Sequence, residues 1–237
     1  KQVQRVVVGA LDPNPRVAGR GVQMLREAGI EVMVGVEESA CRELNKRFLC
    51  LHEHHRPYVI LKWAQTLDGF LDTTRTLEQS ASQGPLLISN AVTKQLVHQM
   101  RAENMAIMVG TQTAILDNPS LQVTRWSGRN PIRVVPDKHN RIPQDSKIFS
   151  MESETFVYRE RTDWQFILTD LASRNIHSIL VEGGSRLLQS ILATDIYDEI
   201  HVEVSPLHLG AGVPAPVVSL PMHYDEIEGN RLYRIMR

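Results

Sequence analysis

Residues 178–187, SILVEGGSRL, constrain the fold of this chain more than any other stretch of its sequence. A short apolar run ends at Glu182, and Gly183 and Gly184 stand directly before a new helical pattern. This order is typical of a buried strand that turns sharply into a helix. Because apolar runs and amphipathic helices alternate along much of the chain, the sequence predicts an α/β sheet, mostly parallel, with some antiparallel pairing near the C-terminus.

The first part of the chain predicts a small βαβ unit followed by a helix. Residues 5–9 and 30–35 are apolar strand candidates, and residues 21–28 between them carry one apolar helical face. The histidine-rich segment further along interrupts the helical pattern, so we expect domains at residues 1–52 and 53–237. The helix before that segment carries an apolar stripe at four-residue steps, which indicates packing in the core. The stripe consists of Val36, Ala40, Leu44 and Phe48.

The second part of the chain predicts a series of strands and two clear helices. One helix begins after Ser89 or Asn90, and the other spans residues 164–174. We expect residues 72–84 and 111–125 to be loops, because their composition is polar and rich in turn formers. The strand candidates are 58–64, 105–110, 131–135, 155–158, 178–182 and 199–204.

The composition favours small-molecule ligands and a reducing compartment. The formal net charge is −1 and no long run of one sign occurs, which argues against a nucleic-acid-binding protein. No apolar run reaches membrane-spanning length. Cys41 and Cys50 match neither a metal-ligand spacing nor a disulfide within one helix. We therefore expect a cytoplasmic protein without a metal site or a membrane span.

Two charged residues stand where a ligand site is expected. Glu182 ends a strand, and ligands of α/β sheets bind at the carboxyl ends of strands. The glycines after it allow a phosphate to approach the N–H groups of the next helix, although a tight structural turn explains them equally well. Lys62 lies inside an apolar strand, where an unpaired ammonium is costly, so it indicates function.

The histidines of residues 51–57 lack zinc-protease spacing, because Arg56 stands where the second ligand belongs.

Four segments together resemble one known family. They are PYVILKWAQTLDGF (57–70), MRAENMAIMVGTQTAILDNPSL (100–121), NPIRVVPD (130–137) and ILVEGGSRLLQS (179–190). In this order and at this spacing they resemble the reductase domain of the bifunctional riboflavin-biosynthesis deaminase/reductase. Residues 5–35 are similar to the tail of the deaminase domain in that family, directly ahead of the reductase.

This resemblance implies a sheet similar to that of dihydrofolate reductase, flanked by helices and preceded by the C-terminal part of a cytidine-deaminase-like α/β domain. It implies that NADPH reduces the ribosyl group of a phosphorylated pyrimidine, 5-amino-6-(5-phosphoribosylamino)uracil, in an enzyme that we expect to be a homo-oligomer. The implied cofactor contacts are Ala64, Leu87, Thr113, Asp117, Lys138, Gly184, Ser185, Arg186, Leu187, Leu188, Gln189 and Ser190. The implied substrate contacts are Pro85, Arg101, Leu121, Arg125 and Glu182.

The implied chemistry also suggests roles for charged residues. Reduction at the sugar carbon C1′ needs a proton donor or a cation nearby, because electron density builds up there. Lys62 is the first candidate for this role, oriented by Glu182, and Asp117 is the second. Arg101 and Arg125 suit the substrate phosphate, because a guanidinium forms bidentate charge-assisted hydrogen bonds.

Departures from the family pattern leave alternatives open. Pro85 and Leu87 stand where family members often carry Ser and Trp, and residues 157–168 form a shorter middle region than usual. A non-catalytic nucleotide-binding module and a related pterin reductase are therefore the two rival hypotheses.

The zinc motifs of the deaminase, His-x-Glu and Pro-Cys-x-x-Cys, do not occur in these 237 residues. Zinc and deaminase activity are expected only with an upstream part that this sequence lacks. The sequence starts at Lys1 without Met, as expected of a fragment in which Asp12 and Asn14 resemble deaminase pocket residues. The other alternative is that residues 1–50 are a structural remnant.

Overall fold

The computed structural model describes residues 3–14, 17 and 19–237, so part of the turn-rich stretch at 12–19 lies outside the described residues. The chain divides into two compact units. One unit comprises residues 1–58 and 168–177, and the other comprises residues 59–167 and 178–237. No helix among the described residues is long and apolar enough to cross a membrane.

The N-terminal unit contains the expected βαβ arrangement. Strands β1 (Arg5–Val8) and β2 (Glu31–Val34) pair in parallel, with Val6 opposite Val32. Helix α1 (Arg20–Glu27) connects them, as the apolar periodicity indicates.

The prediction of a single helix after this unit is wrong, because two helices occupy that segment. Helix α2 (Glu38–Leu44) ends at Asn45, and helix α3 (Lys46–His54) begins there. The Asn45 side chain donates a hydrogen bond to the Cys41 carbonyl, and such local bonds compete with helix continuation. The expected core stripe is broken accordingly: Leu44 is 86% exposed. Helix α3 runs past residue 52, and the domain boundary there stays a prediction.

The second unit is built on a mixed, eight-stranded sheet in the order β11-β12-β9-β3-β8-β5-β6-β7. Strand β3 pairs in parallel with β9, and β5 pairs in parallel with β6 and β8. Strand β12 pairs antiparallel with β9 near the C-terminus. The predicted α/β fold with a mostly parallel sheet is confirmed. The strands are β3 (Tyr58–Gln65), β5 (Ala106–Met108), β6 (Ile132–Pro136), β7 (Thr155–Tyr158), β8 (Ser178–Glu182), β9 (Glu199–Val204), β11 (Asp225–Ile227) and β12 (Asn230–Met236).

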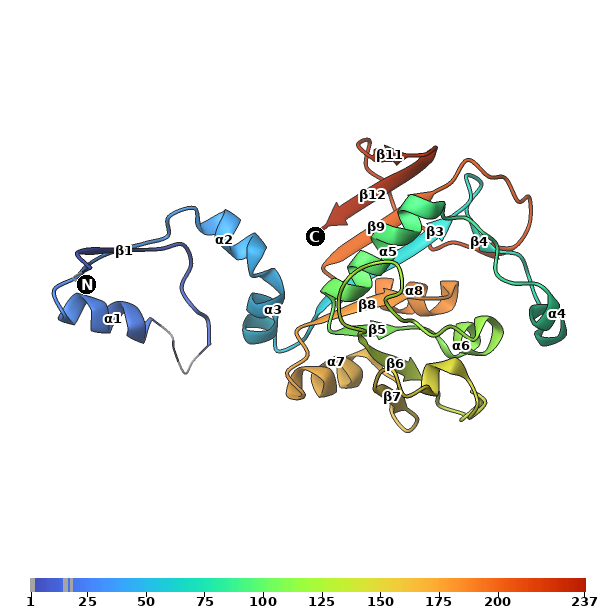
Figure 1. Ribbon diagram of the computed structural model, residues 1–237, viewed down its shortest axis with the longest axis horizontal. Coiled ribbons are helices and arrows are strands. Elements are labelled where there is room, and N and C mark those ends of the chain that lie inside the picture. The colour runs from blue at the N-terminus through green and yellow to red at the C-terminus, as the bar shows by residue number, and fades with distance from the viewer. Residues whose placement is uncertain (1–2, 15–16, 18) are drawn as a thin grey trace. The chain divides into compact units, whose positions relative to one another are not determined.

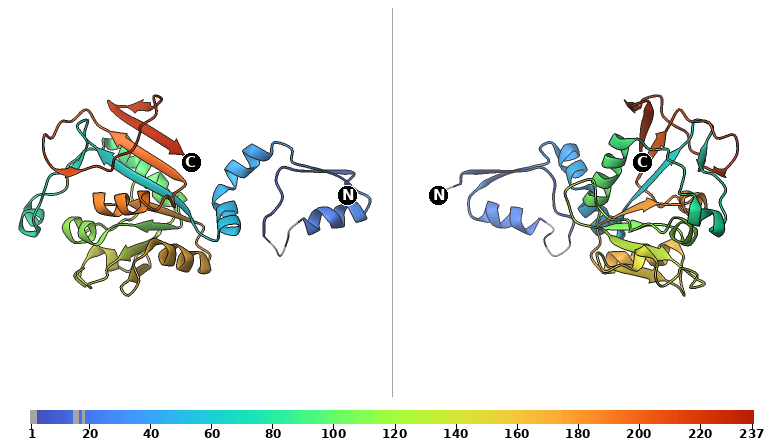
Figure 2. Two further views of the ribbon diagram at one scale, coloured as in Figure 1. Left: turned by 180° about the vertical axis from the view of Figure 1, so that it is seen from behind. Right: turned by 45° about the vertical axis from the view of Figure 1, so that its right-hand side comes forward.

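Helices α5 (Ala91–Glu103) and α8 (Ser185–Leu192) cover opposite faces of this sheet (Figures 1 and 2). This placement follows from right-handed crossovers, because α5 leads to a strand on one side of β3 and α8 leads to a strand on the other. Covered on both faces, the central strands are almost wholly apolar and buried. Asn90 caps α5 by accepting a hydrogen bond from the Thr93 N–H group, as expected.

Both segments expected to be loops contain short helices, so those two predictions are wrong. Helix α4 (Leu77–Ser82) starts with a capping box between Thr76 and Gln79, which stabilises a single short helix without long periodicity. Helix α6 (Thr111–Asp117) buries Ala114. The remaining elements are β4 (Phe70–Asp72), β10 (Val213–Pro214), α7 (Trp164–Ser173) and a 3-10 turn, η1 (Lys147–Phe149).

Candidate functional site

The glycine pair after Glu182 lets two strand-to-helix turns pack against each other. A Cβ atom at Gly183 would lie 3.2 Å from the backbone nitrogen of Gly110, in the turn between β5 and α6. A Cβ atom at Gly184 would lie 3.0 Å from the Thr113 hydroxyl, which accepts a hydrogen bond from the Gly184 N–H group. The carboxyl ends of β8 and β5 therefore approach more closely than side chains would allow.

Glu182 forms a bidentate ion pair with Arg101 on α5. The Arg101 Nη2 atom lies 2.6 Å from Glu182 Oε2, and Nε lies 2.9 Å from Oε1. Both side chains are largely buried. Burial alone raises the pKa of the Glu182 carboxyl, but the charge and hydrogen bonds of Arg101 outweigh it and leave that pKa below its ordinary value. Glu182 is therefore a fixed, ionised carboxylate at neutral pH.

Lys62 lies near two carboxylates at the same end of the sheet. Its ammonium is 3.9 Å from Oε2 of Glu203 and makes no hydrogen bond to any residue that the structure describes. Burial lowers the pKa of Lys62, while the charges of Glu182 and Glu203 oppose that change and the charge of Arg101 adds to it. Glu182 thus influences Lys62 through its charge, but the hydrogen bonds of Glu182 go to Arg101. A buried ammonium with unused donors is suited to an external acceptor.

Helix α5 also holds the loop that follows α6. Arg101 donates a third hydrogen bond, from Nη1 to the carbonyl of Gln122, at 3.2 Å. His98 Nδ1 accepts a hydrogen bond from the Thr124 N–H group at 3.1 Å. Burial, together with the charge of Arg101, lowers the pKa of His98, which favours the neutral ring that this bond requires. The loop is thereby fixed next to the Glu182 pair.

Two substrate residues implied by the resemblance lie in this loop. Leu121 has a φ of 57° and packs in the apolar cluster formed with Ile107 and Val135, so only its main chain is free to meet a ligand. Arg125 is exposed and has no ion pair within the described part of the chain. Both roles stay predictions.

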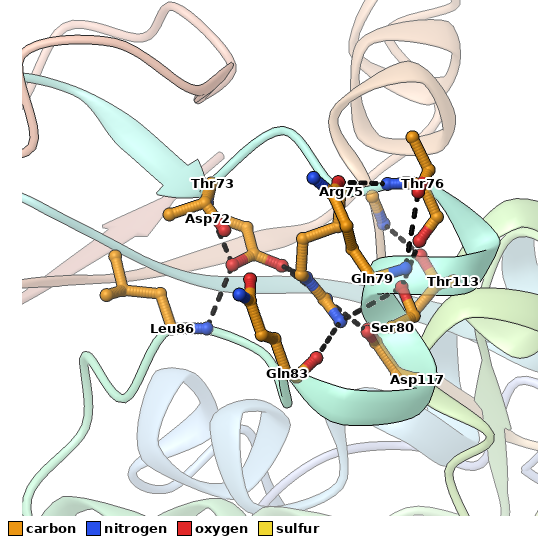
Figure 3. A network of polar contacts seen from close by, with 11 residues as sticks. Asp72, Thr73, Arg75, Thr76, Gln79, Ser80, Gln83, Leu86, Thr113 and Asp117 are labelled. Carbon is orange, nitrogen blue, oxygen red and sulfur yellow. Dashed lines mark hydrogen bonds and ion pairs between the residues drawn. The ribbon is translucent and has the colours of Figure 1, made fainter.

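Asp117 lies in a second network, which connects α6 to the segment around α4 (Figure 3). Arg75 Nη2 lies 2.5 Å from Asp117 Oδ1 and 2.5 Å from Asp72 Oδ2. A further Arg75 donor binds the Gln83 carbonyl. Burial raises the pKa of Asp117 and Asp72 adds to this, so the attraction to Arg75 does not restore the ordinary value. The carboxylate that the resemblance assigns to the cofactor is therefore engaged by Arg75.

The other implied contacts differ in exposure. Leu87 is 71% exposed, directly after Leu86, whose N–H group is held by Asp72. On α8 the buried and exposed positions alternate with the helical period, and these roles too stay predictions. Among the implied contacts, Ser185 and Leu188 are buried, Ala64 and Leu187 are half-buried, and Pro85, Lys138, Arg186, Gln189 and Ser190 are exposed.

Sequence reasoning missed several residues of these networks. Glu203 was detectable in principle, because Glu199, His201 and Glu203 alternate along one strand and therefore share one face. Arg75 had no comparable signal, since it lies in a segment without periodicity and contacts a residue 42 positions away. Among the described residues, no group of three or more His, Cys, Asp or Glu side chains could hold a metal ion.

Comparison with known proteins gives the family. The model of the RibD C-terminal domain matches residues 57–223. The riboflavin biosynthesis protein RibD of Aquifex aeolicus is 36% identical over 233 residues, which is 89% of this chain and 64% of that protein. This chain therefore spans less than two thirds of the length of that relative.

Solved structures agree with this match. One match is a crystal structure from Thermotoga maritima, described as a diaminohydroxyphosphoribosylaminopyrimidine deaminase/5-amino-6-(5-phosphoribosylamino)uracil reductase. The alignment covers 98% of this chain and 71% of that one, with 28% identity and a TM-score of 0.85. RibD of Acinetobacter baumannii covers 99% of this chain and is covered to 73%, with 29% identity and a TM-score of 0.86. The chain therefore belongs to the riboflavin-pathway reductase family that is defined by the RibD C-terminal domain.

Proposed function

We propose that this chain reduces the ribosyl group of 5-amino-6-(5-phosphoribosylamino)uracil to the ribitylamino product with NADPH. The observation that carries the proposal is the buried Lys62 ammonium, which has no hydrogen-bond partner in the described part of the chain and lies near the ionised Glu182. Such an arrangement can give a proton to a bound group that gains electron density. Both residues lie on strands that family motifs match.

The residues present fit NADPH at the turn between β8 and α8. Helix α8 begins at Ser185 without a side-chain cap, so N–H groups of its first turn are available to a phosphate. Gly183 and Gly184 carry no side chain between this turn and the turn that holds Thr113, so the two turns lie close together. We propose that residues 184–190, Thr113 and Lys138 hold the cofactor, which supplies a hydride when bound.

The chain's own groups would bind the substrate and manage the proton. Arg125, exposed and without an ion pair in the described residues, would bind the substrate phosphate. Glu182, held by both oxygens on Arg101, would accept hydrogen bonds from sugar hydroxyls or ring N–H groups. Lys62 Nζ would donate a proton to the oxygen or nitrogen on C1′ as that carbon receives the hydride.

The test follows NADPH absorbance with freshly deaminated 5-amino-6-(5-phosphoribosylamino)uracil, and with dihydrofolate as a parallel substrate. We expect oxidation with the first substrate only, and a loss of about 100-fold or more in kcat for Lys62→Met. The matched control is Lys138→Met, which removes an exposed lysine and should alter NADPH affinity more than kcat. Turnover by Lys62→Met at the wild-type rate would remove Lys62 from the proton-donating role.

Two observations favour a second candidate, a non-catalytic nucleotide-binding module. Asp117 is engaged by Arg75, and Leu87 is exposed in a segment that departs from the family pattern. Saturable NADPH binding without oxidation by either substrate would support this candidate. Oxidation with dihydrofolate would instead support a pterin reductase.

We extend the proposal to the whole protein. A longer chain that carries the zinc motifs upstream would also deaminate the pyrimidine. The protein would be a cytoplasmic homo-oligomer, and the boundary between its two domains would follow residue 52. Size-exclusion chromatography with light scattering tests the oligomer, and zinc analysis of the longer chain tests the metal.

A further inference from the structure

Glu203 is a buried carboxylate to which the proposed reduction assigns no role. It lies on β9 and is 2% exposed. Two neutral donors bind it: the Ser89 hydroxyl lies 2.6 Å from Oε2, and the Asn230 side-chain nitrogen lies 2.6 Å from Oε1. Each oxygen is therefore fixed by one hydrogen bond, and the orientation of the carboxylate is set from both sides.

Among the described residues, the ammonium of Lys62 forms an ion pair with it, at 3.9 Å from Oε2. The pairing of parallel strands β3 and β9 explains this proximity, because His201 stands opposite Lys62 and Glu203 stands opposite Ala64. Lys62 and Glu203 are thus diagonal neighbours on one face of the sheet, a distance that a long side chain can bridge. A buried carboxylate needs such a charge partner in addition to neutral donors.

We propose that Glu203 is a positioning residue for Lys62: the carboxylate that Ser89 and Asn230 fix holds the ammonium in place and keeps its proton on Nζ. This inference rests on the proposed function, in which Lys62 gives that proton to the substrate. Glu203 itself touches neither substrate nor cofactor in this scheme.

The charges around Lys62 explain why a second carboxylate is needed. Four charged groups lie together: Glu182 from β8, Glu203 from β9, Arg101 from α5 and Lys62 itself. Burial and the charge of Arg101 both favour the neutral amine of Lys62, and only the two carboxylates oppose them. Because both oxygens of Glu182 are bound to Arg101, Glu203 is the carboxylate whose charge Arg101 does not already pair.

The experiment measures the ionisation of Lys62 directly. Lysine labelled at Cε is titrated by NMR in the wild type, and Lys62→Gln identifies the signal. In Glu203→Gln the uncharged amide keeps the size of the side chain, and we expect the pKa of Lys62 to fall by about one unit or more. The matched control is Glu199→Gln, because Glu199 is an equally buried carboxylate on the same strand that bonds to His201 and Arg234. This control should leave Lys62 unchanged.

Enzyme kinetics give the second measurement. Glu203→Gln should lower kcat about tenfold or more at neutral pH, with the KM for substrate and the NADPH affinity nearly unchanged. The loss should be largest at the alkaline end of the pH profile, because there the variant's Lys62 has released its proton. A purely structural role would instead lower kcat without moving the profile.

The outcomes separate the two hypotheses. An equal pKa of Lys62 in the wild type and in Glu203→Gln overturns the role of Glu203, whatever the activity. An inactive wild type whose Lys62 still responds to Glu203→Gln overturns the proposed function and leaves the positioning intact. If Glu203→Gln does not fold, Glu203→Asp withdraws the charge by one methylene and should shift the pKa of Lys62 in the same direction by a smaller amount.

Discussion

The Arg101–Glu182 and Arg75–Asp117 pairs have similar lengths, 2.6 Å and 2.5 Å, yet the pKa values of their carboxyl groups move in opposite directions. Glu182 has a guanidinium to itself, and its pKa falls below the ordinary value despite burial. Asp117 shares Arg75 with Asp72, and its pKa rises. Burial is the largest influence at both carboxyl groups: at Glu182 the charge and hydrogen bonds of Arg101, together with the charges of Lys62 and His98, outweigh it, whereas at Asp117 Arg75 does not and the charge of Asp72 adds to it.

The comparison separates a permanent pair from one that can be exchanged. In the first pair one cation meets one carboxylate, so breaking it leaves a buried charge alone. In the second, one cation serves two carboxylates, and either can leave without isolating Arg75. The Glu182 pair is thus suited to hold a site in fixed geometry, whereas Asp117 can be released to a ligand while Asp72 retains the arginine.

The largest effect is expected where the permanent pair is broken. Glu182→Leu leaves Arg101 buried without its partner and should lower the free energy of unfolding by about 3 kcal/mol. The double variant Arg101→Met/Glu182→Leu should recover most of this loss, because no lone charge remains. Urea denaturation followed by circular dichroism measures both. A single variant as stable as the wild type would show that the pair does not anchor α5.

A smaller loss is expected in the shared network. Arg75→Met should lower the free energy of unfolding by about 1–2 kcal/mol, because the two carboxylates are partly hydrated and repel each other once the guanidinium is gone. The control is Arg141→Met, an exposed arginine in the same unit. The same denaturation experiment measures the free energy of unfolding of both variants. Equal losses in the two would contradict the role of the network.

The opposite pKa shifts predict opposite pH dependences. Because the pKa of Glu182 is below 4.5 in the folded state, its contribution to stability is complete above 4.5 and is lost as the pH falls through the folded value. The pKa of Asp117 is above 3.8 in the folded state, so its contribution declines as the pH rises from 3.8 to the folded value.

Unfolding free energies of the wild type, Glu182→Gln and Asp117→Asn, measured from about pH 3 to pH 7, test this difference. The advantage of the wild type over Glu182→Gln should grow as the pH rises. Its advantage over Asp117→Asn should shrink. Parallel curves for the two variants would refute the contrast between the pairs.

The smallest effect is expected at an exposed pair, which provides the baseline. Arg5 and Glu31 lie 2.9 Å apart on β1 and β2, with side chains 61% and 57% exposed. Glu31→Gln should change the free energy of unfolding by less than about 0.5 kcal/mol, because water and salt screen the pair. Thermal unfolding at low and high salt measures it. A loss as large as that of Arg75→Met would mean that burial does not separate these pairs.

The two pairs also differ in how far they could be predicted from sequence. Arg101 and Glu182 lie in segments with strong periodicity and family resemblance, so both were identified as site residues, although their contact across 81 positions was not. Arg75 and α4 lie where a single capping box forms the helix, which long-range periodicity cannot detect. The strands at the centre of the sheet were predictable because both of their faces are buried and apolar.

The break at Asn45 shows the same limit. Val36, Ala40, Leu44 and Phe48 have helical spacing, and one side-chain hydrogen bond to the Cys41 carbonyl is enough to end the helix between them. The predictions that failed therefore depended on hydrogen bonds between a residue and its near neighbours, whereas the strands that were predicted correctly have repeated apolar patterns.

The close approach at Gly183 has a consequence for how this chain can change over generations. Any larger residue there would meet the backbone of Gly110 and Val109, which cannot move aside as a flexible side chain can. Compensation would require the whole turn after β5 to shift, and with it the Thr113 hydroxyl that receives the Gly184 N–H group. A single substitution of Gly183 is therefore disfavoured unless the facing turn changes with it. Random mutagenesis with selection for a folded protein should return glycine at position 183, while exposed positions nearby such as Arg186 vary freely.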